Sequence, residues 1–160
     1  MSHYHVTPLP KSLTDEVRLS HRSPGYGHPV HIEMAGGTGP CRQCLSPFLP
    51  GTDRRILFTH RPVADHGTIT APGPVFIHEQ DCERYDASTF PPGLKGFPLA
   101  IEARGSQGRV LEARIGAGEE AVQLVEELLE GEGVTHLYLR HAEAGCFIAR
   151  VDPQIEGLMD

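Results

Sequence analysis

The sequence predicts a single α+β domain, in which a mainly antiparallel sheet packs against one main helix and the N-terminal half is rich in loops. Two patterns favour this class. Several short apolar segments are separated by Gly and Pro turns, and a helix, a strand, a turn and a strand follow one another at the C-terminus. A chain of 160 residues is long enough to bury a core of its own. We expect this domain to span residues 1–152.

Residues 1–40 are expected to form an irregular lead-in, because proline and glycine recur throughout them. One short helix is predicted inside this segment, over residues 12–19, with Ser12 as its N-cap. Residues 25–30 predict a turn. At the other end of the chain, residues 153–160 are expected to form a loose tail.

Short apolar runs with β-prone centres predict six strands after the lead-in. They cover residues 55–60, 75–78, 99–104, 109–115, 134–140 and 146–151. Residues 105–108 predict a hairpin between the third and fourth of these strands, and residues 142–145 predict the turn between the last two. Strands joined by such short connections pair antiparallel.

The clearest predicted helix covers residues 119–130. Its apolar residues recur at helical spacing and form a broad stripe: Ala121, Val122, Leu124, Val125, Leu128 and Leu129. Glu119 and Glu120 suit the positive N-terminal end of a helix, and Gly131 is a typical residue at which a helix ends. We expect the apolar stripe to cover one side of the sheet.

The charge and hydropathy of the chain argue against two classes of partner. The sequence carries 14 basic and 21 acidic side chains, a net charge of −7, and the acidic excess lies in residues 81–160. Nucleic-acid interfaces need clustered basic charge, so this balance disfavours nucleic acid as a partner. No run approaches 18 apolar residues, so no membrane-spanning helix is expected. Because the N-terminus also lacks the pattern of a secretory signal, we expect a cytoplasmic protein with reduced cysteines.

Four residues have the spacing of a metal site. Cys41 and Cys44 form a C-x-x-C pair, and His78 and Cys82 form a second pair at the end of a predicted strand. Three thiolates and one imidazole are a known ligand set for structural zinc, and four protein ligands leave no position for a substrate. The sequence therefore predicts zinc bound by Cys41, Cys44, His78 and Cys82.

Two other interpretations of the C-x-x-C pair stay open. Its thiols are small enough to pack at a turn without any ligand. A redox pair is the third interpretation, but thioredoxin-like motifs lie between a strand and a helix. Here a Gly- and Pro-rich segment precedes Cys41, and Ser46-Pro47 begins no clear helix.

Cys146 is a separate candidate, at the start of a predicted strand. A thiol beside Arg or His has a lowered pKa and becomes a better nucleophile, and Arg140 and His141 lie close to Cys146 in the sequence. Arg42 and Arg140 are candidates for gripping a carboxylate or phosphate if they converge. The alternatives are a small residue at a hairpin turn and an ordinary solvated face.

Several motifs along the chain carry a family resemblance. The most specific are Pro40-Cys41-Arg42 and Gly145-Cys146-Phe147, and others occur at residues 26–30, 61–62, 73–78, 82–85 and 138–140. Together they resemble an uncharacterised bacterial family, the domain of unknown function 1203, which has no assigned reaction. The resemblance implies that Cys41, Cys146, Arg42 and Arg140 line one pocket. It also implies that some relatives carry Ser in place of Cys44 and Arg in place of His78, so that zinc would belong to this branch of the family.

Three classes of function follow from these patterns. The first is a non-catalytic binding or interaction module that a structural zinc stabilises. The second is a cysteine-dependent enzyme or small-anion binder that uses Cys146 or Cys41 beside arginines. The third is a homo-oligomer formed by self-association of the chain. No pattern in the sequence names a substrate, a reaction or a partner.

Overall fold

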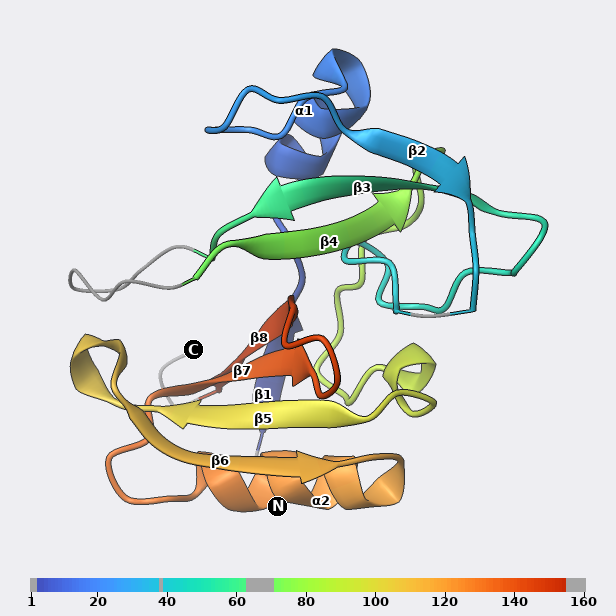
Figure 1. Ribbon diagram of the computed structural model, residues 1–160. Coiled ribbons are helices and arrows are strands. Elements are labelled where there is room, and N and C mark those ends of the chain that lie inside the picture. The colour runs from blue at the N-terminus through green and yellow to red at the C-terminus, as the bar shows by residue number, and fades with distance from the viewer. Residues whose placement is uncertain (1–2, 38, 63–70, 155–160) are drawn as a thin grey trace.

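Five strands form one antiparallel sheet: β1 (Tyr4–Thr7), β5 (Leu99–Arg104), β6 (Val110–Gly116), β7 (His136–His141) and β8 (Phe147–Pro153). Their order in the sheet is β1-β8-β7-β5-β6 (Figure 1). The computed structural model describes residues 3–37, 39–62 and 71–154. The predicted hairpin is confirmed, because β5 and β6 pair antiparallel with Leu99 opposite Gly116.

Three more strands form a second antiparallel sheet: β2 (His31–Met34), β3 (Arg54–His60) and β4 (Gly73–His78), in that order. The expectation of one sheet is thereby corrected to two. Within this sheet, β3 pairs with β2, which precedes it in the chain, and with β4, which follows it. Residues 79–98 then lead to the other sheet, and their Pro91-Pro92 pair disfavours a continuing strand.

The first 40 residues are more regular than the sequence indicated. The predicted helix is confirmed as α1 (Lys11–Ser20), but its N-cap is Pro10 rather than Ser12. Strands β1 and β2 were not expected. β1 is four residues long, and it is held by pairing with β8 at the far end of the chain, with Val6 opposite Val151. Residues 155–160 of the expected tail lie outside the described residues, whereas Pro153 belongs to β8.

Helix α2 (Glu119–Leu129) packs against β5, β6 and β7 and confirms the predicted main helix. The buried residues of its apolar stripe are Ala121, Leu124, Val125, Leu128 and Leu129. They form one core with the buried side chains of the five-stranded sheet, including Ile101 and Leu139. Figure 1 shows α2 on the outer side of this sheet, away from β2, β3 and β4.

A second core joins the two sheets. Val17 of α1 packs with Ile56 and Ile77 of the three-stranded sheet, and the same cluster includes Tyr138 of β7 and Phe147 of β8. The Tyr138 and Phe147 rings meet edge to face, with their centroids 5.3 Å apart. Because side chains of both sheets share this core, the three-stranded sheet packs against the side of the five-stranded sheet that faces away from α2 (Figure 1).

His60 at the end of β3 lies at this junction and makes stability depend on pH. Its ring lies 6.0 Å from that of Phe147, and burial lowers the pKa of His60 to about 4. The unfolded chain takes up this proton near pH 6.5 and the folded chain does not. The free energy of unfolding should therefore decrease as pH drops from about 6.5 towards 4, by about 1–2 kcal/mol at pH 5. Urea denaturation of wild type and His60→Gln at pH 7.5 and pH 5 measures the difference, which should shrink in the variant. Equal losses in both proteins would contradict this assignment.

Candidate metal centre

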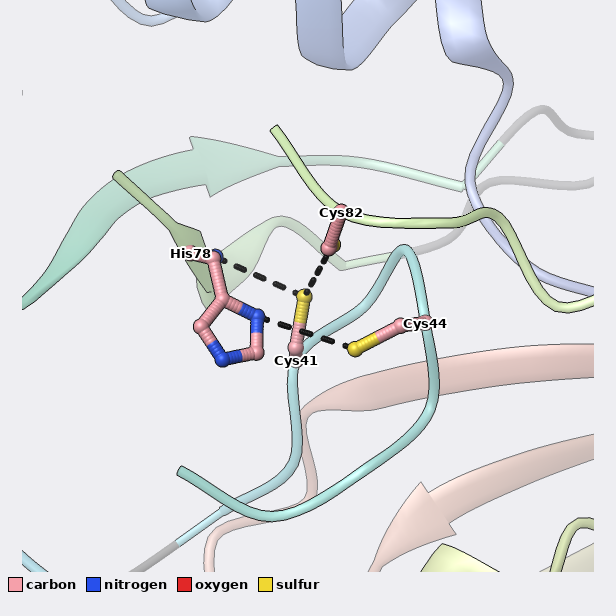
Figure 2. Close-up of side chains that lie close together, drawn as sticks. All are labelled: Cys41, Cys44, His78 and Cys82. Atoms are coloured by element: carbon pink, nitrogen blue, oxygen red, sulfur yellow. Dashed lines mark hydrogen bonds between the residues drawn. The ribbon is translucent and has the colours of Figure 1, made fainter. Parts of the chain in front are cut away.

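Cys41, Cys44, His78 and Cys82 come together at one end of the three-stranded sheet (Figure 2). Their ligand atoms all lie within 4.8 Å of one another. Figure 2 shows that they come from three segments: Cys41 and Cys44 from one turn, His78 from the end of β4, and Cys82 from the segment after it. None of the four cysteines of the chain forms a disulfide.

The turn that carries Cys41 and Cys44 is held by its own backbone. The Leu45 amide donates to the Cys41 carbonyl at 2.9 Å, and the Cys41 amide donates to the Ser46 carbonyl at 2.9 Å. Leu45 adopts a positive φ of 56°, which is uncommon for a residue with a side chain, and its side chain is fully buried. This tight turn brings the two cysteines onto the same side.

The spacing of the ligand atoms fits a tetrahedral ion. The Sγ atoms of Cys41 and Cys82 lie 3.7 Å apart, and Cys44 Sγ lies 3.6 Å from His78 Nδ1. A disulfide would require about 2.05 Å between sulfur atoms. Around a tetrahedral zinc, with bonds of about 2.3 Å to sulfur and about 2.0 Å to nitrogen, sulfur atoms lie about 3.8 Å from each other and about 3.5 Å from the nitrogen.

Charge within the cluster also favours a cation. Burial raises the pKa of Cys41, but hydrogen bonds with Cys44, Cys82 and His78 together lower it by more, so the net pKa lies below its ordinary value. Hydrogen bonds with Cys41 and Cys44 raise the pKa of Cys82 above its ordinary value. Hydrogen bonds to Cys41 and Cys44 likewise raise the pKa of His78 to about 10. A bound metal ion stabilises all three thiolates together and takes His78 as a neutral ligand.

Asp53 supports the His78 imidazole at the ring nitrogen that points away from the cluster. His78 presents Nδ1 to the cluster, and its Nε2 lies 3.3 Å from Asp53 Oδ2. The backbone amide of Leu49 donates to the same oxygen at 2.8 Å, and this bond lowers the pKa of the Asp53 carboxyl. A carboxylate on the outer nitrogen of a histidine is a common support for a metal ligand, since it selects the tautomer and makes the ligand more basic.

Replacing Asp53 with asparagine should weaken metal binding and leave the fold intact. The amide oxygen of Asn still accepts the Leu49 amide but no longer carries the charge that supports His78. We expect the affinity for zinc to fall about tenfold. Competition with a chromophoric chelator at pH 7 measures this, with Asp152→Asn as the control because Asp152 pairs with Arg150 outside the cluster. Unchanged zinc affinity in Asp53→Asn would show that the carboxylate has no such role.

The structure separates Cys146 from the other three cysteines. Cys146 lies in the turn before β8 rather than in the strand, and it lines a cavity of about 550 Å³ together with Arg42. Cys41 does not line this cavity. A neighbouring cavity of about 230 Å³ is lined by Arg140 and again by Cys146. Arg140 is paired with Glu102 at 3.0 Å. Of the four residues suggested by the family resemblance, Cys146 therefore shares one cavity with Arg42 and the other with Arg140, and Cys41 lines neither.

The comparison with protein families settles where the chain belongs. Residues 38–152 match the family described as protein of unknown function (DUF1203). The chain belongs to this family. The DUF1203 match covers all four residues of the metal cluster and also Arg42 and Cys146. Searches of curated proteins and of solved structures returned no match. Among the described residues, no helix has the length and apolar character needed to cross a membrane.

One side chain that holds the cluster in place, Arg18, precedes the DUF1203 segment. Its role was not predicted from the sequence. Arg18 of α1 donates through Nη1 to the side-chain oxygen of Gln43 at 2.7 Å, and through Nε to the His78 carbonyl at 3.1 Å. Gln43 is fully buried, and its amide nitrogen donates to Asp81 at 2.8 Å and to the Cys82 carbonyl. Arg18 and Gln43 lie 25 positions apart in the sequence, so no local pattern indicates that they meet.

Proposed function

We propose that this chain binds one zinc ion through Cys41, Cys44, His78 and Cys82, and that the ion has a structural role in a non-catalytic binding or interaction module. The observation that carries the proposal is the convergence of three sulfur atoms and one imidazole nitrogen within 4.8 Å. Thiolate-rich sites with one imidazole favour zinc over magnesium or calcium, which prefer oxygen ligands.

The donor set supports a structural role for the ion. Four protein ligands complete a tetrahedral shell and leave no open position for a reacting molecule. The ion would join the turn at residues 41–44 to the end of β4 and to the segment that leaves it. Backbone hydrogen bonds hold the turn and β4 separately, and a metal would link these separate segments to each other.

Metal analysis of the untagged protein, purified under reducing conditions, tests the proposal. We expect about one zinc per chain by plasma mass spectrometry. Thiol titration of the native protein should detect Cys146 first, and the other three cysteines should react only after a chelator is added. A folded protein without metal, in which all accessible thiols react before chelation, would refute the proposal and leave the cysteines as packed or redox-active groups.

A further inference from the structure

A cavity of about 550 Å³ lies apart from the metal cluster, where the turn before β8 faces the three-stranded sheet. Its size is that of a small-molecule site. Apolar side chains form much of the wall, including Leu57, Phe76 and Phe97. Four groups with polar chemistry line it as well: Arg42, His141, Glu143 and Cys146. None of these four belongs to the proposed metal site.

Arg42 brings a buried positive charge without a carboxylate partner. Its side chain is 2% exposed, and among the described residues no carboxylate lies within 4.0 Å of its guanidinium. Nε donates to the Phe147 carbonyl at 2.8 Å and Nη1 to the Pro40 carbonyl at 2.7 Å. In the described part of the chain, Nη2 has no hydrogen-bond partner. Burying a guanidinium against neutral carbonyls is costly, so the cavity favours an anion beside Arg42.

His141 supplies a second donor whose tautomer is set by the turn. The backbone amides of Glu143 and Ala144 point at Nδ1 of His141, at 3.3 and 3.5 Å. Nδ1 therefore acts as an acceptor, which leaves the proton of the neutral ring on Nε2. His141 is 9% exposed, and its Nε2 has no hydrogen-bond acceptor among the residues that the structure describes.

We propose that this cavity binds a small carboxylate with a short apolar body, held by Arg42 and His141 beside the Cys146 thiol. One guanidinium balances the single charge of a carboxylate. A phosphate dianion would carry excess negative charge next to Glu143, which lies on the rim of the same cavity. The apolar wall of Leu57, Phe76 and Phe97 suits a hydrocarbon chain or ring.

Two matched pairs of compounds test the proposal on the full-length, zinc-containing protein. Phenylacetate and 4-methylpentanoate each carry the carboxylate, whereas phenylacetamide and 4-methylpentanamide keep the shape without the charge. Calorimetry measures binding, and alkylation of Cys146 by iodoacetamide reports occupancy of the cavity. We expect at least one carboxylate to bind and to slow Cys146 alkylation at saturation, and its amide to bind at least about tenfold more weakly. Equal effects of acid and amide, or no effect of either acid, would overturn the proposal.

Three variants locate the binding site. Asn in place of His141 keeps an acceptor for the Glu143 and Ala144 amides and removes the Nε2 donor, so His141→Asn should weaken carboxylate binding about tenfold. Arg42→Met should abolish it. Arg114→Gln removes an exposed charge on β6 and should leave the affinity unchanged.

Zinc is measured in each variant because Arg42 lies next to Cys41. A variant that keeps its zinc but loses carboxylate binding shows an effect on the cavity and not on the metal site. If Arg42→Met does not fold, the carboxylate affinity of His141→Asn alone tests the assigned site. Wild-type affinity in a folded His141→Asn variant would refute the role of His141 and with it the assigned site.

Discussion

Substitution of Cys41 by serine is expected to release the metal and to unfold the chain or leave it severely destabilised. Cys41 is the most buried of the four ligands and contacts both Cys82 and the backbone amides of Gln43 and His78. Zinc sites in small domains contribute about 10–16 kcal/mol of binding free energy to the folded state. We therefore expect a loss of more than about 3 kcal/mol in the free energy of unfolding, measured by urea denaturation alongside zinc analysis.

A second ligand variant separates loss of metal from the cost of burying a hydroxyl at position 41. Cys44 is partly exposed, so a serine there carries less of that cost, and Cys44→Ser should still lose zinc and most of the stability. Cys146→Ser is the matched control, since it makes the same chemical change outside the cluster and should keep both properties. If Cys44→Ser retains its melting temperature and its zinc, the structural metal site is wrong.

Replacing Gly93 with alanine is expected to destabilise the protein by about 2 kcal/mol or more. Gly93 lies in the 3₁₀ turn η1 (Pro92–Leu94), which packs on the turn that follows Cys44. A Cβ atom at position 93 would lie 2.5 Å from the Leu45 carbonyl oxygen and 2.7 Å from Ser46 Cα. Both are backbone atoms, so no side chain can move aside to relieve the overlap, and overpacking of this kind costs about 1–3 kcal/mol or more.

Gly96→Ala is the control for this prediction. Gly96 follows in the same segment, and no atom lies within 4 Å of a Cβ placed there. Alanine at position 96 should change the free energy of unfolding by less than about 0.5 kcal/mol, as surface substitutions usually do. Thermal denaturation of both variants, with their zinc content, measures the contrast. Equal stability of Gly93→Ala and Gly96→Ala would show that η1 is not tightly packed against Leu45 and Ser46.

The metal cluster and the proposed anion cavity share one short segment. Cys41 faces the cluster, and the next side chain, Arg42, crosses to the Phe147 carbonyl of β8. Burial lowers the pKa of Arg42 to about 10, so the side chain remains a cation at neutral pH. A metal that fixes Cys41 and Cys44 would also fix the backbone from which Arg42 reaches the cavity. Loss of zinc is therefore expected to weaken carboxylate binding even though the two sites share no ligand.

The sequence by itself determined the elements whose signal is local. The apolar stripe of α2 and the two apolar runs that flank the turn of the β5–β6 hairpin are local patterns, and the bounds of these elements were predicted to within two residues. The four candidate metal ligands were also selected from spacing, because the two residues of each pair are only three or four positions apart in the sequence. The membership of the chain in the DUF1203 family followed from short motifs in the right order.

Only the tertiary structure decided which of these local pieces meet. It placed β1 beside β8, divided the strands between two sheets, and brought the two ligand pairs together across 34 residues. It also gave Arg140 a carboxylate partner in Glu102, whereas Arg42 has none among the described residues, a distinction that no sequence pattern carries. The physical reason is that periodicity records which face of an element is buried, whereas the partner on that face is chosen by the packing of segments distant in the chain.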